Sequence, residues 1–175
     1  MEISLVKLFS RDGASETYKL PLELSEMEIG GVIYPLLESQ PVELTLTHEE
    51  NYVLKITGGT KLKLELSCAR CLCPVEKEFV LTFDRKIDFN LTEEEREDLG
   101  EDSSFADKNF LDVEALIRNE LLVQWPIRVL CKDDCKGICS RCGANLNFQT
   151  CDCDTTVPDP RMAAIRDIFS KFKEV

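Results

Sequence analysis

Residues 131–153 read CKDDCKGICSRCGANLNFQTCDC and contain six of the nine cysteines in the chain. Within this stretch, Cys139 and Cys142 form a C-x-x-C-G turn that ends at Gly143. The spacing lets two thiolates bind one tetrahedral zinc ion. Glycine suits the turn because the backbone there tends to take positive φ, while its N–H groups point back at the sulfurs. The stretch therefore predicts a C-terminal segment that is braced by metal.

The flanking cysteines offer more than one way to complete a site of four thiolates. Considering reach along the chain, we predict a single structural Zn²⁺ ion with four ligands: Cys135, Cys139, Cys142 and Cys151, with Cys131 and Cys153 as alternates. Such a site is closed and leaves no position for water or substrate. A two-zinc, six-cysteine cluster matches the count, but it would need a second C-x-x-C that the segment lacks.

Disulfides are the main alternative to zinc, because cysteine spacing does not fix connectivity. The chain starts with MEISLVKLFSRDG, which carries charges throughout and does not resemble a secretory signal. No apolar run approaches the 18 residues that a membrane span requires. We therefore expect a cytoplasmic protein with reduced thiols, in which such cysteine patterns are more often metal sites.

The charge of the chain is unevenly distributed. Its formal net charge is −12, yet residues 131–175 carry seven basic and seven acidic side chains, so the acidic excess precedes the cysteine-rich segment. This balance argues against a protein that wraps around a phosphate backbone. Any RNA contact is expected in the C-terminal third, and a basic protein partner fits the acidic excess at least as well.

The first half of the chain predicts an antiparallel meander. Val42, Leu44 and Leu46 alternate with polar residues, which is typical of a half-buried strand. The expected strands are residues 3–9, 16–20, 42–47, 52–57, 62–66 and 75–83 (continuing to about 89), with 32–37 as an apolar edge or loop. Turns are expected at residues 11–13, at 48–51 and at Gly58-Gly59, the first joining a pair formed by the strands 3–9 and 16–20. The predicted fold class is α+β, with about five to seven strands.

A second cysteine group, Cys68, Cys71 and Cys73, lies in the predicted turn before Pro74. It could be a zinc knuckle, half of an intermolecular site, or a redox pair. A redox C-x-x-C normally opens a helix, whose N-terminus lowers the thiol pKa, whereas a proline and a strand follow here. We therefore favour a knuckle or a structural turn. The only histidine, His48, is expected to be solvated in a turn, which leaves ordinary Ser-His or Cys-His catalysis without a base.

The remaining residues predict a linker and two helices. Residues 91–108 contain eight acidic and two basic side chains, which is typical of a mobile solvated loop. We accordingly divide the chain into a β region (1–90), this linker, and a C-terminal region (109–175). Asp112 is expected to cap a helix with Val113, Leu116, Ile117 and Leu121 on one face, ending near Trp125 because Pro126 follows. Trp125 and Leu130 are expected to bury against the sheet, and Asp159-Pro160 to start a second helix that packs on the same domain.

Taken together, these motifs carry a resemblance. The chain resembles the YceD family of bacteria and plastids, the large ribosomal RNA subunit accumulation proteins. The resemblance rests on C-A-R-C-L-C-P at residues 68–74, the acidic spacer, C-K-D-D-C-K-G-I-C-S-R-C-G-A-N-L-N at 131–147, and the later C-D-C and D-P-R. The resemblance implies a cytoplasmic, non-enzymatic factor that supports accumulation of 23S ribosomal RNA.

We therefore expect a protein that acts by binding during maturation of the large ribosomal subunit. Its partner would be a basic ribosomal protein, a nuclease or 23S rRNA, and no small molecule or membrane is expected. The candidate contact residues are four cations: Arg70, Lys132, Lys136 and Arg141. Two alternatives remain open, namely a zinc store or sensor, and a thiol redox protein that uses Cys68 and Cys71.

Overall fold

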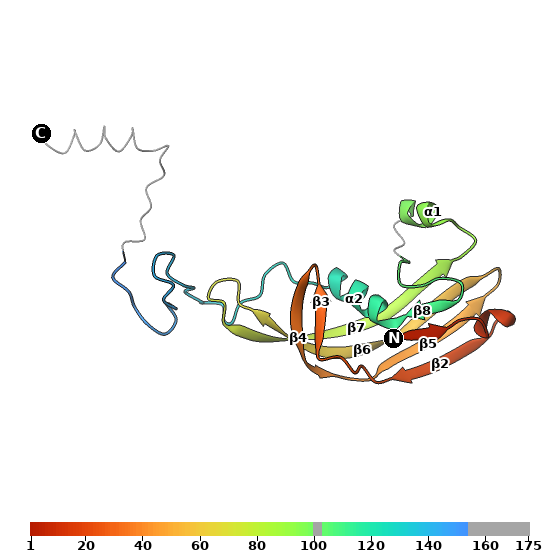
Figure 1. The fold of residues 1–175 in the computed structure, drawn as a ribbon, viewed down its shortest axis with the longest axis horizontal. Coiled ribbons are helices and arrows are strands. Elements are labelled where there is room, and N and C mark those ends of the chain that lie inside the picture. Colours follow the sequence, from red (N-terminus) through yellow and green to blue (C-terminus); the bar gives the residue numbers. More distant parts are fainter. Residues whose placement is uncertain (100–102, 154–175) are drawn as a thin grey trace, which may run out of the picture. The chain divides into compact units, whose positions relative to one another are not determined.

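The structure is a computed structural model, and it describes residues 1–99 and 103–153 (Figure 1). Within these residues it is mostly antiparallel β-sheet with two α-helices. The elements in chain order are β1 (Glu2–Ser4), the 3-10 turn η1 (Leu8–Ser10), β2 (Ser15–Leu20), β3 (Glu26–Ile29), β4 (Val32–Ser39), β5 (Val42–Glu49), β6 (Val53–Ser67), β7 (Pro74–Asp88), α1 (Glu93–Asp98), β8 (Phe110–Asp112) and α2 (Val113–Val123). No helix among the described residues is long and apolar enough to cross a membrane.

The chain divides into two compact units. The first, which we call the sheet unit, comprises Met1–Ser67 and Pro74–Val129. The second, the cysteine unit, comprises Cys68–Cys73 and Leu130–Val175. This division differs from the predicted boundaries at residues 90 and 108, because the turn between β6 and β7 groups with the C-terminal segment.

Strand β6 organises the sheet unit. It pairs with β7 along its whole length, from Val53↔Asp88 to Ser67↔Pro74. Its other edge is shared, because β5 pairs with the first half of β6 and β4 with the second. Strand β2 extends the sheet beyond β5, and β3 extends it beyond β4. All of these pairings are antiparallel.

The predicted turn at Gly58-Gly59 is wrong, because both glycines lie inside the continuous strand β6. Gly58 has a φ of +144°, and a Cβ on it would lie 2.0 Å from the carbonyl oxygen of Glu43 in β5. A Cβ on Gly59 would lie 2.4 Å from the carbonyl oxygen of Leu81 in β7. The glycine pair therefore permits close approach of the neighbouring backbones on both sides rather than a reversal of the chain.

The predicted first hairpin is also wrong. Only Glu2–Ser4 forms a strand, and it pairs with β8 in a separate two-stranded sheet. The following residues turn into η1 instead of continuing, and β2 pairs with β5. The segment left open as an edge or loop is strand β4, which pairs with both β3 and β6.

His48 is buried, contrary to the predicted solvated turn. Strand β5 continues to Glu49, so the period-two alternation of buried residues carries on and His48 is only 2% exposed. Its ring packs edge-on against Phe9, and Nδ1 lies 3.1 Å from the carbonyl oxygen of Arg11. The histidine is thus part of the packing at this end of the sheet.

The acidic interval 91–108 contains more structure than the predicted solvated loop. Helix α1 begins with a capping box, in which the Thr92 N–H donates to Glu95 Oε2 over 2.8 Å. Arg96 and Phe105 are buried, and the Asp112 N–H donates to the Phe105 carbonyl. Charge density along the sequence did not reveal these two anchors.

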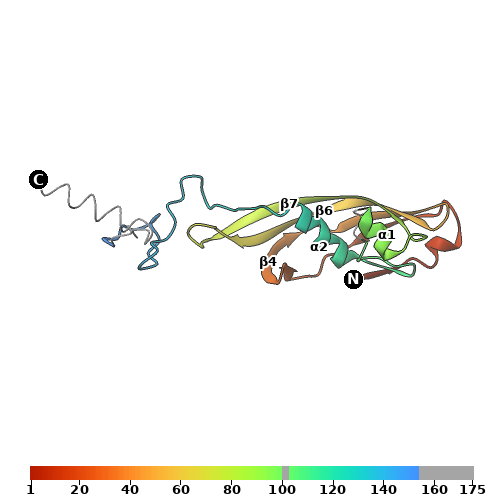
Figure 2. The ribbon, with the colours of Figure 1, turned by 90° about the horizontal axis from the view of Figure 1, so that it is seen from above.

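Helix α2 follows the prediction closely. The Asp112 carboxylate accepts hydrogen bonds from the Glu114 and Ala115 N–H groups, as an N-cap does. The four predicted positions on one face, Val113, Leu116, Ile117 and Leu121, are buried. Figures 1 and 2 show α2 along one face of the sheet, where it contacts β7 and β3. The helix ends at Val123, two residues before Trp125.

Trp125 is anchored to the sheet, as predicted. Its ring stacks on Phe79, with 5.6 Å between the ring centroids and 9° between the planes, and it also contacts Tyr34 at 4.8 Å. Leu130 is half-buried and groups with the cysteine unit. The helix predicted from Asp159 lies outside the described residues.

Candidate metal centre

The two C-x-x-C turns have the same backbone geometry. In the first, the Leu72 N–H donates to the Cys68 carbonyl over 3.0 Å, and the Cys68 N–H donates to the Cys73 carbonyl over 2.8 Å. Leu72 takes a φ of +60°, which is unusual for a residue with a side chain.

The second turn repeats this pattern at residues 139–144. The Gly143 N–H donates to the Cys139 carbonyl over 2.9 Å, and the Cys139 N–H donates to the Ala144 carbonyl over 2.8 Å. Gly143 has a φ of +72°, as the motif predicts. Both turns therefore present two sulfurs from a knuckle of one shape.

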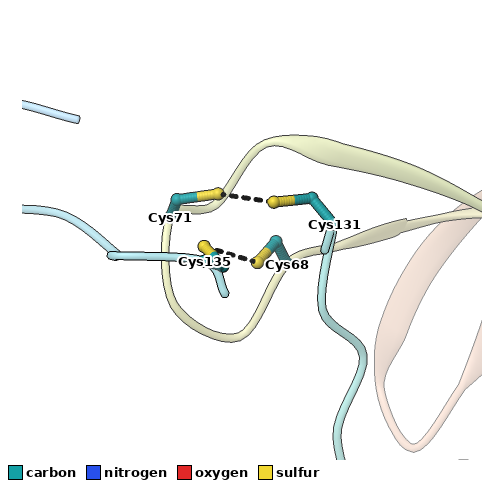
Figure 3. Close-up of side chains that lie close together, drawn as sticks. All are labelled: Cys68, Cys71, Cys131 and Cys135. Atoms are coloured by element: carbon teal, nitrogen blue, oxygen red, sulfur yellow. Dashed lines mark hydrogen bonds between the residues drawn. The ribbon is translucent and has the colours of Figure 1, made fainter. Parts of the chain in front are cut away.

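The first knuckle lies next to Cys131 and Cys135, which come from the segment after the sheet. The sulfurs of Cys68 and Cys135 are 3.8 Å apart, and those of Cys71 and Cys131 are 3.5 Å apart (Figure 3). All four sulfurs lie within 4.8 Å of one another. We call this set site A. It joins positions that are 60 and 67 residues apart in the chain.

The second knuckle lies next to Cys151 and Cys153. The sulfurs of Cys139, Cys142, Cys151 and Cys153 also lie within 4.8 Å of one another, and we call this set site B. All its members fall between residues 139 and 153, so the site is local in sequence. Each of the two sets could hold a metal ion.

These sets differ from the predicted ligands. The four thiols predicted to share one zinc divide between the sites, with Cys135 in site A and the other three in site B. The alternates also divide, with Cys131 in site A and Cys153 in site B. Sequence distance favoured Cys135 for the nearer knuckle, whereas the fold brings in the remote turn between β6 and β7. Cys73 belongs to neither set, and all nine cysteines are free thiols.

The first cysteine of each knuckle has a lowered pKa. Burial raises the pKa of Cys68, but backbone N–H groups, those of Arg70 and Cys71 among them, outweigh it and lower this pKa to about 6. In site B the Cys142 and Arg141 N–H groups lower the pKa of Cys139 to about 6. The Cys142 thiol raises the pKa of Cys153 to about 12. Several thiolates crowded together oppose further ionisation, and a divalent cation would remove that opposition.

Two asparagines of the G-A-N-L-N motif donate hydrogen bonds to cysteine sulfurs outside site B. Asn147 Nδ2 donates to the Cys135 sulfur of site A over 3.3 Å, and this contact lowers the pKa of Cys135. Asn145 Nδ2 donates to the Cys73 sulfur over 3.2 Å. Both asparagines follow the knuckle of site B directly, yet one donates to a thiol of site A and the other to a thiol of the first knuckle turn. Neither asparagine was predicted as a site residue, although both lie in the motif that follows the second knuckle.

The four predicted contact residues are all exposed, but they are not equally free. Arg70 Nη1 donates to the Cys135 carbonyl over 2.8 Å, so Arg70 helps to close site A. Lys132 lies 3.8 Å from the Asp134 carboxylate. Within residues 1–99 and 103–153, no ion pair involves the side chains of Lys136 or Arg141.

Comparison with known proteins shows which family the chain belongs to. The family model described as "Large ribosomal RNA subunit accumulation protein YceD" matches residues 56–169, which include both knuckles and all eight thiols of the two sites. The chain belongs to the YceD family. The match also covers most of β6, all of β7 and helix α2 of this YceD protein.

A curated relative supports the family. It is the "Large ribosomal RNA subunit accumulation protein YCED homolog 1, chloroplastic" of Arabidopsis thaliana, with 42% identity over 43 residues. The aligned segment spans 25% of this chain and 13% of the relative. No solved structure matches the chain.

Proposed function

We propose that this YceD protein supports accumulation of the large-subunit ribosomal RNA by binding within the maturing subunit, without catalysing a reaction. The observation that carries the proposal is the family match over residues 56–169, because the family is described by this role. The closed character of four-thiolate sites supports a structural rather than a catalytic use of the cysteines. We also propose a cytoplasmic location, because thiols remain reduced there and can bind metal.

We propose zinc as the metal, in a structural role. Four thiolates in tetrahedral reach select zinc or iron–sulfur chemistry among the common protein metals. The knuckle spacing of two residues between cysteines is the one that structural zinc sites use. Zinc would hold the backbone of the cysteine unit in place, and the unit would present side chains to a partner.

Lys136 and Arg141 are the contact residues we propose for the RNA of the particle. Both are exposed, and neither is paired with a carboxylate in the part of the chain that the structure describes. Two cations provide only a weak, salt-sensitive contact with phosphates. A second candidate partner is a basic protein of the particle, such as a ribosomal protein or a nuclease, because the net charge of −12 favours it.

The role is tested by depleting the protein in the organism that encodes it. We expect a selective fall in 23S relative to 16S rRNA, and fewer free large subunits on sucrose gradients. Restoring the wild-type gene should reverse both effects. Unchanged rRNA ratios and gradients after full depletion would refute the proposed role.

The contact surface is tested with Lys136→Glu/Arg141→Glu, measured by co-sedimentation with large-subunit precursors over a salt series. We expect weaker association and a salt dependence reduced by about one per lost phosphate contact. Lys61→Glu/Lys77→Glu in the sheet unit is the matched control, since it changes the net charge equally at exposed positions. Equal association of the two variants would exclude the Lys136–Arg141 surface and favour a basic protein partner.

A further inference from the structure

We propose that the cysteine unit binds two zinc ions in separate four-thiolate sites, one at site A and one at site B. Site A would join the turn between β6 and β7 to the segment after residue 130, and site B would close a local loop. This inference extends the proposed structural role of zinc, but it stands on the thiol geometry and not on the ribosomal role.

The sulfur separations support metal ligation over disulfides. A tetrahedral zinc site with Zn–S bonds of about 2.3 Å places its sulfurs about 3.8 Å apart. In site A the separations of 3.8 Å and 3.5 Å lie close to this value. A disulfide would bring two sulfurs to about 2.05 Å. The pairs of site A are therefore spaced as ligands of a common ion.

The shared geometry of the two knuckles argues for two sites of one kind. Each has the same pair of backbone hydrogen bonds and a left-handed fifth residue, Leu72 in one and Gly143 in the other. A left-handed backbone is unfavourable for leucine, and burial of its side chain does not offset this cost, because Leu72 is 65% exposed. The strained turn at Leu72 orients two sulfurs toward Cys131 and Cys135, which is what ligation at site A requires.

The contacts around site A complete its shell. Arg70 holds the Cys135 carbonyl, the Ile138 N–H donates to the Arg70 carbonyl over 3.1 Å, and Asn147 donates to the Cys135 sulfur. In metal sites, hydrogen bonds of this type orient the residues that bind the metal directly and tune the charge on their ligand atoms. Three of the four site A cysteines are buried, whereas Cys139 is the one buried cysteine of site B. Site A is thus the more enclosed of the two, and its zinc should exchange more slowly.

The test is the zinc content of the purified full-length protein, measured by native mass spectrometry and by elemental analysis under reducing conditions. Cys131→Ser and Cys142→Ser form a matched pair, because each removes the exposed cysteine of its site and disturbs packing least. Cys73→Ser is the control, since it changes the cysteine outside both sites. We expect two zinc ions in the wild type and in Cys73→Ser, one in each single variant, and none in the double variant.

Other outcomes separate the alternatives. One zinc in the wild type, lost in Cys142→Ser and kept in Cys131→Ser, would restore the single site predicted from the sequence and overturn the proposal. Two zinc ions retained in Cys71→Ser would place both in residues 131–153 and also overturn it. Cobalt titration of the wild type gives an independent readout that does not require any variant to fold. Two equivalents with tetrahedral thiolate absorption support the proposal, and saturation at one equivalent refutes it.

Exchange kinetics test the inequality of the sites. With excess chelator, the wild type should release zinc in two phases of equal amplitude. Cys142→Ser should lack the fast phase, and Cys131→Ser should lack the slow one. Loss of the slow phase in Cys142→Ser would contradict the assignment. These measurements are independent of ribosome profiles, so failure of one proposal is distinguishable from failure of the other.

Discussion

At the residue scale, backbone conformation decides what several positions tolerate. Gly58 lies between β5 and β7, where a Cβ would overlap a carbonyl oxygen of β5. Gly143 and Leu72 occupy the equivalent positions of the two knuckles, with positive φ in both. The same left-handed conformation is thus adopted by Gly143, for which it is favourable, and by Leu72, for which it is unfavourable.

Gly58→Ala should destabilise the sheet unit by about 3 kcal/mol, because the strand must shift to remove a 2.0 Å overlap. Gly30→Ala is the control. It also has positive φ, but a Cβ there meets nothing within 4 Å, so a loss of about 1 kcal/mol is expected. Urea denaturation followed by tryptophan fluorescence measures both. Similar losses in the two variants would show that backbone overlap is unimportant at Gly58.

Gly143→Ala should weaken zinc binding at site B by about fivefold, since a left-handed alanine costs about 1 kcal/mol. Leu72→Gly at the equivalent position of site A should not weaken binding, because it relieves the same strain. Competition with a chromophoric chelator measures the affinities. A loss of affinity in Leu72→Gly would mean that the leucine side chain itself supports the knuckle.

At the element scale, an ion pair with a buried carboxylate and a half-buried arginine connects α2 with β7. Arg85 Nε donates to Glu120 Oε1 over 2.6 Å, and the Glu120 side chain is only 8% exposed. Glu120 is the charged residue on the buried face of a helix that is otherwise apolar on that side. The pair therefore specifies which position of β7 lies beside α2, while burial of the apolar face of the helix supplies most of the packing energy.

Arg85→Met should destabilise the protein by roughly 2 kcal/mol, because it leaves a buried carboxylate without its charged donor. Lys86→Met on the same strand is the control, since Lys86 is 62% exposed and its partner Glu49 is 37% exposed, and pairs that water reaches contribute less than about 1 kcal/mol. Thermal unfolding monitored by circular dichroism gives the comparison. Adding Glu120→Leu to Arg85→Met should recover much of the loss, and absence of recovery would contradict this explanation.

At the scale of the whole molecule, the two units depend on different forces. The hydrophobic core of the structure consists entirely of sheet-unit residues, from Ile3 to Leu121. In the described part of the cysteine unit, the buried apolar side chains are cysteines: Cys68, Cys71, Cys135 and Cys139. A segment without an apolar core needs cross-links or metal to fold. We therefore expect metal binding to supply the folding energy of this unit.

Removal of metal under reducing conditions should unfold the cysteine unit and leave the sheet unit intact. Hydrogen exchange should show lost protection in residues 130–153 and at 68–73, with unchanged protection in β5, β6 and β7. Re-addition of zinc should restore protection. A single cooperative loss of protection across the whole chain would show that the sheet unit also depends on metal.

The sequence determined local features whose causes are local. Alternation in β5, the Asp112 cap, the buried face of α2 and the two C-x-x-C motifs were all readable, because period, capping and ligand spacing act over a few residues. It also identified the family from these motifs. The prediction failed for Gly58-Gly59 because a glycine pair has the same appearance in a turn and in a crowded strand.

Tertiary structure alone decided which cysteines meet. Cys135 lies four residues from Cys139 in the sequence, yet its sulfur lies beside that of Cys68, which is 67 residues away. The register of the long β6–β7 pairing places residues 68–73 in the turn between these strands, and this turn belongs to the cysteine unit. Likewise, His48 is buried by the extension of β5, which depends on partners on both sides of that strand. The ligand set of site A and the burial of His48 depend on long-range contacts, and sequence spacing carries no record of these.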